Sequence, residues 1–203
     1  MINKIVAIQG NHPSKLNLKN DTSIFLAVEA QNRNCKIFYY EPKNLSIIND
    51  KVLAKGYYIK FNYSNNNFFK VISKRTLDLS KCKCLLIRQD PPFNLEYIST
   101  TYILDKIKNK IKIVNNPTAI RNISEKLYSA KFLKFMPNTI FTKDINEINK
   151  FFIKNKKIII KPIHSFSGND IHLVDRKINE KQILNFIKKH GHIMCQKFLP
   201  KIK

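Results

Sequence analysis

A run of β-branched residues bounded by lysines constrains the fold of this chain more than any other segment. The run lies within Lys157–Pro162, and a second apolar run, Ile171–Val174, follows after a short segment of small and polar residues. The first run predicts a buried strand, and the second predicts its partner in a hairpin. Lys161 stands at the strand end, beside a loop whose backbone N–H groups can face an anion. The pattern suggests a nucleotide phosphate site, although a solvated Lys-Pro pair at a strand end would look the same.

The N-terminal residues predict a β-α-β unit. Asp21 or Thr22 can cap its helix, which has an apolar face. Two strands joined by a helix pair in parallel, and the loop 9–20 after the first strand is where open α/β sheets bind ligands. The predicted strand, helix and strand cover residues 4–8, 23–32 and 35–40.

Residues 41–80 predict a small peripheral sheet of antiparallel strands, separated in part by the polar stretch 62–67. The expected strands are 52–54, 57–61 and 68–72.

The apolar run Cys84–Ile87 predicts another strand, which delivers Arg88 and Asp90 to its end. Pro91 and Pro92 follow and keep the chain extended there. The arginine and the aspartate could recognise a carboxylate or an amine, or they could form an ion pair that braces the loop. The residues alone leave both interpretations open.

The pattern changes after Pro117, which places a domain boundary near residues 117–123. We expect one domain over residues 1–120 and a second over residues 121–203. Before the boundary we expect a helix from Asn94 to about 108, a strand over 111–114 and a turn over 118–121. After it we expect helices over 124–133, 144–154 and 180–190 and strands over 139–141 and 193–198, besides the hairpin.

The formal net charge of +23 would by itself suggest a nucleic-acid partner. The lysines are scattered along the chain, however, and form no block longer than pairs such as Lys156-Lys157. We therefore interpret the charge as a solvated basic surface and expect no nucleic acid. A nucleic-acid-binding protein stays as an alternative that rests on charge alone.

The cysteines indicate a reduced, cytoplasmic protein. No secretory signal precedes them, and no segment approaches the roughly 20 apolar residues of a membrane span, so we expect no membrane contact. Cys82 and Cys84 could be half of a metal site, yet no second Cys or His pair has suitable spacing. We expect structural cysteines.

Several segments together resemble the prokaryotic glutathione synthetase family of the ATP-grasp superfamily, and the resemblance runs through nearly the whole chain. One segment alone would be weak, but the combination is specific. The segments are Lys19–Ser23, Glu29–Gln31, Arg88–Phe93, Tyr102–Leu104, Val114–Pro117, Arg121–Asn122, Glu125–Leu127, Ile160–Pro162 and Gln196–Pro200.

The resemblance implies an α/β fold. An N-terminal parallel-sheet domain, Rossmann-like and called pre-ATP-grasp, would precede an incomplete ATP-grasp domain. It also implies cofactor-binding residues: lysines that contact the ATP phosphates, a loop that covers them and a strand that holds the adenine. These are Lys126, Lys161, Ser167, Gly168, Gln196, Phe198 and Leu199. The implied substrate-binding residues are Lys19, Asp21, Arg88 and Asp90.

The implied reaction is the bacterial synthesis of glutathione by a ligase. ATP phosphorylates the cysteinyl carboxylate of γ-glutamylcysteine, and the amine of glycine attacks the acyl phosphate. The resemblance also implies Mg²⁺, which offsets charge on the transferring phosphoryl group, and a homo-oligomer.

Two departures from the family pattern stand out. The phosphate-covering loop, His164–Gly168, keeps a single glycine, and Gly10–His12 lacks the acidic residue of many relatives. The family's Mg²⁺ ligands would lie beyond Lys203, so we expect no metal ligand within the chain. We therefore expect a truncated chain that makes no glutathione alone. The alternative is a non-catalytic ATP-grasp remnant that binds nucleotide or peptide.

Overall fold

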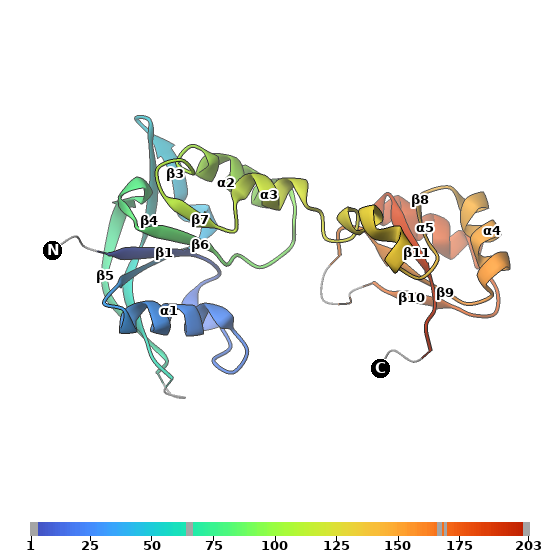
Figure 1. Ribbon diagram of the computed structural model, residues 1–203, viewed down its shortest axis with the longest axis horizontal. Helices are drawn as coiled ribbons and strands as arrows, with labels where there is room; N and C mark the ends of the chain where they lie inside the picture. The colour runs from blue at the N-terminus through green and yellow to red at the C-terminus, as the bar shows by residue number, and fades with distance from the viewer. Residues whose placement is uncertain (1–3, 64–66, 166–167, 169, 201–203) are drawn as a thin grey trace. The chain divides into compact units, whose positions relative to one another are not determined.

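The computed structural model describes residues 4–63, 67–165, 168 and 170–200 (Figure 1). The chain divides into an N-terminal unit, Met1–Asn122, and a C-terminal unit, Ile123–Lys203. Each unit combines a sheet with helices, as the predicted α/β class requires.

The N-terminal unit is built on a seven-stranded sheet with the order β3-β4-β2-β1-β6-β7, and β5 pairs with β4. β1 pairs in parallel with β2 and with β6, and β6 pairs in parallel with β7. β4 joins β2 in the antiparallel sense, so the sheet is mixed. The strands are β1 (Ile5–Gln9), β2 (Lys36–Tyr40), β3 (Leu45–Ile48), β4 (Lys51–Phe61), β5 (Phe69–Asp78), β6 (Cys84–Ile87) and β7 (Lys112–Val114).

Helices cover both faces of this sheet (Figure 1). Helix α1 (Thr22–Asn32) packs Ile24 and Ala27 against one face, and α2 (Leu95–Asp105) packs Leu104 against the other. β1 lies between both cores, which explains why its first four residues are all apolar rather than alternating. The predicted β-α-β unit is confirmed, and Asp21 is its N-cap, with its Oδ1 accepting from the Ser23 N–H at 2.7 Å.

The prediction of a peripheral sheet over residues 41–80 was wrong in three respects. β4 is one strand of eleven residues, it belongs to the main sheet, and the strand β3 was not predicted at all. Gly56 lies between the two predicted strands and continues β4. A Cβ there would lie 2.4 Å from the Tyr39 carbonyl oxygen, so only glycine lets the two backbones approach this closely.

Two expectations around the boundary between the units were also wrong. The turn expected at residues 118–121 is a short helix, α3 (Pro117–Asn122), whose Arg121 forms an ion pair with Asp105 of α2. The helix expected over 124–133 is instead a kinked 3-10 helix, η4 (Tyr128–Phe135), in which Phe132 departs from helical dihedrals. No residue of η4 is buried, so no core contact holds it in the α-helical form.

The C-terminal unit is a four-stranded sheet with the order β10-β9-β11-β8, covered on one face by α4 and α5. β9 and β10 form the predicted antiparallel hairpin, with Ile160 opposite His172. Ile158, Ile160 and Cys195 lie against the two helices. The elements are β8 (Thr139–Thr142), α4 (Ile145–Asn155), β9 (Ile158–Pro162), β10 (His172–Val174), α5 (Glu180–His190) and β11 (Ile193–Lys197).

The cysteines are free thiols, and two of them are core residues. Burial raises the pKa of Cys82 and that of Cys195 to about 12, so both thiols stay protonated at neutral pH. In the described ranges, no helix combines the length and the apolar character needed to cross a membrane.

We predict that Gly56→Ala destabilises the N-terminal unit by about 1–3 kcal/mol, because the added methyl group meets backbone that cannot move aside. Hydrogen exchange read by mass spectrometry should show faster exchange in β2 and β4, with the C-terminal strands as an internal reference. Lys55→Ala is the matched control, since the neighbouring side chain is exposed. Equal protection of β2 in Gly56→Ala and wild type would contradict the prediction.

Candidate functional site

The alternation of side chains along β9 determines which face of the sheet carries Lys161. Ile158 and Ile160 point to the core under α4 and α5, so Lys161 points to the other face of the sheet. Gln196 and Thr139 lie on that same face, since Cys195 and Ile140 beside them pack into the core. We call this surface, which carries Thr139, Lys161 and Gln196, the lysine face.

Lys161 is half-buried on the lysine face and has a fixed partner. Its Nζ donates a hydrogen bond of 3.0 Å to Oε1 of Gln196 on the neighbouring strand β11. The sequence predicted both residues as binding residues, and the fold brings them into contact. A lysine held by one neutral acceptor keeps ammonium hydrogens for a further acceptor, such as a phosphate oxygen.

Lys126 meets the segment that follows β9. Its Nζ donates to the backbone oxygen of Ser165 and approaches the Ser165 Oγ at 3.4 Å. The Ser165 hydroxyl in turn donates, at 3.3 Å, to the carbonyl oxygen of Pro162, the last residue of β9. The ammonium group of Lys126, the second predicted phosphate lysine, therefore lies at the beginning of the loop that follows β9.

The two lysines influence each other electrostatically. Burial lowers the pKa of Lys161, and the positive charge of Lys126 lowers it further. An anion bound beside both ammonium groups would relieve this repulsion and stabilise their charged forms. The arrangement therefore favours a polyanion, and a phosphate chain fits that chemistry.

The predicted nucleotide site also includes the loop residues Ser167 and Gly168 and the residues Phe198 and Leu199 after β11. Gly168 has φ +74°, a backbone conformation that suits glycine, and Ser167 lies outside the described residues. Phe198 and Leu199 follow β11 rather than belonging to it. The Phe198 N–H donates to the Lys157 oxygen at 3.0 Å, and Lys157 Nζ lies 4.6 Å from the Phe198 ring centroid.

A second group of predicted residues gathers in the N-terminal unit, where β1 and β6 end. Arg88 donates from Nη2 to Thr22 Oγ1 at 2.5 Å and from Nε to Ser23 Oγ at 3.2 Å, both at the beginning of α1. Asp90 accepts from Asn11 Nδ2 at 2.6 Å. Within the described part, Arg88 and Asp90 do not pair with each other, so the ion-pair interpretation was wrong.

Lys19 and Asp21 complete this predicted group with different roles. Asp21 already uses a carboxylate oxygen to cap α1. Lys19 is exposed on a turn, where its backbone N–H donates to Asn17 Oδ1 at 3.0 Å. Both lie on the loop and helix start that follow β1, which is where open α/β sheets place ligands.

Sequence reasoning missed the buried side chains that hold this edge together. Gln9 at the end of β1 is fully buried, accepts from the Tyr40 hydroxyl at 2.9 Å and donates to Gln89 Oε1 at 2.9 Å. Tyr39 donates from its hydroxyl to the Asn11 carbonyl at 2.8 Å. A polar glutamine directly after four apolar residues was the signal that could have revealed this network.

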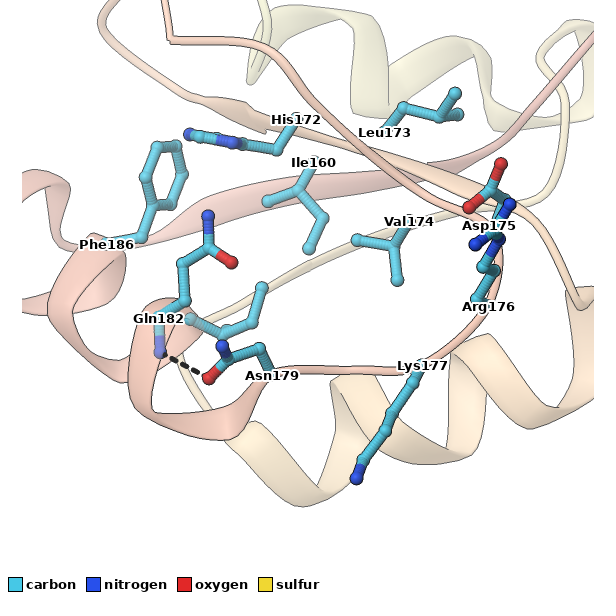
Figure 2. Close-up of a pocket in the computed structure, with 11 residues that line it drawn as sticks. Ile160, His172, Leu173, Val174, Asp175, Arg176, Lys177, Asn179, Gln182 and Phe186 are labelled. Atoms are coloured by element: carbon cyan, nitrogen blue, oxygen red, sulfur yellow. Dashed lines mark hydrogen bonds between the residues drawn. The ribbon is translucent and has the colours of Figure 1, made fainter.

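A pocket of about 130 Å³ lies between β10 and the beginning of α5, and Figure 2 shows the side chains that line it. The His172 ring meets Phe186 edge to face with centroids 4.8 Å apart. Ile160 also lines the pocket, so it lies on the helix-covered face of the sheet, opposite Lys161. This pocket therefore lies on the opposite face of the sheet from Lys161.

The carboxylates near the hairpin do not form a metal site. Asp170 lies 3.0 Å from Lys189 Nζ, Asp175 lies 3.7 Å from Lys157 Nζ, and Glu180 accepts from Asn149. Across the described ranges, no three His, Cys, Asp or Glu side chains are arranged to hold a metal ion. Mg²⁺ needs oxygen ligands that converge, so the residues described do not fit it.

Two family models match this chain and together cover most of it. The model described as prokaryotic glutathione synthetase, N-terminal domain, matches residues 5–121. The model described as prokaryotic glutathione synthetase, ATP-grasp domain, matches residues 125–203.

Curated relatives agree with this match. The chain is 36% identical over 176 residues to the glutathione synthetase of Mesorhizobium japonicum, an alignment that covers 85% of this chain and 56% of the relative. It is 31% identical over 205 residues to that of Agrobacterium fabrum, covering 98% of this chain and 64% of the relative. The chain thus spans less than two thirds of the length of these relatives.

Solved structures share the fold at low identity. A RimK domain protein ATP-grasp from Sphaerobacter thermophilus superposes with a TM-score of 0.60 at 13% identity, covering 97% of this chain and 64% of its own. D-cycloserine synthetase DcsG gives 0.62 at 10% identity, covering 96% and 59%. These neighbours, together with the second family model, identify the C-terminal unit as ATP-grasp in fold.

We predict that Lys126→Met raises the pKa of Lys161, because removing the neighbouring positive charge favours the charged form of the remaining lysine. Titration of ¹³C-methylated lysines by NMR measures this pKa directly. Lys143→Met is the control, since Lys143 is an exposed lysine elsewhere in the same unit. If both variants left the Lys161 titration unchanged, the two lysines would not be coupled.

Proposed function

This chain belongs to the prokaryotic glutathione synthetase family, and on that premise we propose that it serves the ATP-dependent ligation of γ-glutamylcysteine to glycine. The observation that carries the proposal is the pair of lysines, Lys126 and Lys161, which reach the loop after β9 and the lysine face beside it. Two cations that repel each other at a half-buried position are well placed to bind a phosphate chain.

ATP, when bound, supplies the phosphoryl group that turns an unreactive carboxylate into an acyl phosphate, which an amine can attack. In our proposal Lys161 and Lys126 bind the phosphates and offset their negative charge. Gln196 fixes the Lys161 ammonium, while Gly168 gives the covering loop a left-handed position that lets the backbone approach an anion. Phe198 and Leu199, directly after β11, are the proposed contacts of the adenine.

The peptide substrate is proposed to bind at the edge of the N-terminal sheet where β1 and β6 end. Arg88 offers a planar guanidinium to a carboxylate, and Asp90 offers a carboxylate to an amine. The hydrogen bond from buried Gln9 to Gln89 supports the segment that carries Arg88 and Asp90. Lys19 and Asp21 flank this edge, which suits a small zwitterionic peptide.

The proposal extends to the protein's setting. We place the reaction in the cytoplasm, in a homo-oligomer, with domains over residues 1–120 and 121–203. Nucleic acid is left out, because Arg88 and Asp90 are held by hydrogen bonds to Thr22 and Asn11 at one sheet edge rather than lying in a basic stripe.

We expect the 203-residue polypeptide to bind ADP, and Lys161→Ala and Lys126→Ala each to weaken binding by roughly 10- to 100-fold, since each loses a charge-assisted hydrogen bond. Isothermal titration calorimetry measures the change. Lys143→Ala, which removes an equal charge elsewhere on the same unit, should bind like wild type. Equal weakening of ADP binding in all three variants would mean that the overall positive charge attracts ADP, and it would contradict a specific site at Lys126 and Lys161.

We also expect this polypeptide alone to make no glutathione, because the described residues offer Mg²⁺ no converging carboxylates. A coupled assay of ADP release with γ-glutamylcysteine and glycine tests this. Sustained turnover that depends on both substrates would overturn the expectation. Saturable ADP binding without turnover would support the binding role and favour the non-catalytic alternative for this polypeptide.

A further inference from the structure

Three neighbouring strands carry a continuous chain of hydrogen bonds across the lysine face. Lys161 Nζ on β9 donates to Gln196 Oε1 on β11 at 3.0 Å, and Gln196 Nε2 donates to Thr139 Oγ1 on β8 at 3.1 Å. Thr139 donates its hydroxyl hydrogen to the Pro137 carbonyl oxygen at 2.6 Å. Thr139 lies directly opposite Gln196 in the register of the sheet, so the chain follows from the strand pairing.

The chemistry of the two ends allows only one orientation of the Gln196 amide. An ammonium group has only donors, so Lys161 must face the amide oxygen. The single hydroxyl hydrogen of Thr139 is committed to the Pro137 carbonyl, which can only accept, so Thr139 presents lone pairs to Gln196. Those lone pairs require the NH₂ group of the Gln196 amide. Lys161 and Thr139 therefore specify the same orientation, with the amide oxygen towards Lys161 and the NH₂ towards Thr139.

The opposite arrangement would be costly at Lys161. A rotated Gln196 would place its NH₂ group against the ammonium, donor against donor, and the ammonium would lose its acceptor on the strand. Lys161 is half-buried, so water replaces that acceptor less effectively than at an exposed position. The Gln196 amide and the Thr139 hydroxyl that orients it thus together keep the Lys161 ammonium in place.

We propose that Thr139 is a positioning residue for phosphate binding, which acts by fixing the Gln196 amide and, through it, the ammonium of Lys161. The inference rests on the proposed function of Lys161 and deepens it. Thr139 is not itself a phosphate contact in this proposal, because its single hydroxyl hydrogen is already donated to the Pro137 carbonyl and a phosphate oxygen needs a donor.

The test compares Thr139→Val with Thr139→Ser. Valine keeps the shape of the side chain and suits a strand but has no hydroxyl, whereas serine keeps the hydroxyl. With ADP as the probe, calorimetry should show binding about 5- to 10-fold weaker in Thr139→Val and within about twofold of wild type in Thr139→Ser. Thermal unfolding of both variants should stay within a few degrees of wild type.

A double variant separates positioning from a general structural effect. In the Lys161→Ala background, Thr139→Val should cause no further loss of ADP affinity, because the group that Thr139 positions is gone. An equal loss in both backgrounds would overturn the proposal. So would wild-type ADP affinity in Thr139→Val.

A measurement without nucleotide distinguishes failure of this inference from failure of the proposed function. In Thr139→Val the NMR titration should place the pKa of Lys161 lower than in wild type, because the charged form loses its ordered acceptor. The Gln196 side-chain amide resonances should also move, and Thr139→Ser should restore both signals. If these signals respond but wild type binds no ADP, the phosphate site fails and the positioning by Thr139 stands. If they do not respond, the positioning fails whatever the nucleotide does.

Discussion

The antiparallel pairing of β9 with β11 is the interaction on which the C-terminal unit depends. It sets Met194 opposite Lys161 and Gln196 opposite Ile159, so Lys161 and Gln196 lie diagonally on one face within hydrogen-bond reach. The same pairing turns Ile160 and Cys195 inward, where they form the core with α4 and α5. A shift by one residue would bury Lys161 and expose Ile158 and Ile160, so the hydrophobic core and the Lys161–Gln196 hydrogen bond favour the same register.

In the N-terminal unit, buried polar side chains rather than strand register hold the candidate residues in place. The crossover from β1 runs through α1 on one face of the sheet, and α2 covers the other face after β6, so the chain leaves the ends of these two strands towards opposite faces. Buried polar side chains stabilise this edge: Gln9 accepts from Tyr40 and donates to Gln89. Arg88 and Asp90 are then directed outward by partners on the neighbouring loop and helix. The charged side chains at this edge depend on neutral ones beneath them.

The large positive charge of the chain has little influence on this organisation. Lysines such as Lys143 are exposed, whereas Lys161 differs because burial and Lys126 lower its pKa. A lysine that has lost part of its water gains more from an anion than a fully solvated one does. Burial, rather than the number of basic residues, therefore identifies the candidate site.

Much of this protein follows from its sequence alone. Local patterns predicted the hairpin around Lys161, the β-α-β unit, the Asp21 cap and the family, because alternation, capping and short motifs are encoded within a few residues. Tertiary structure decided the rest. Position 56 requires a glycine because the Tyr39 backbone of another strand lies against it, and Thr139 meets Gln196, 57 positions away, because β8 and β11 pair. Contacts between strands distant in sequence depend on register and packing, and those are determined only when the whole sheet assembles.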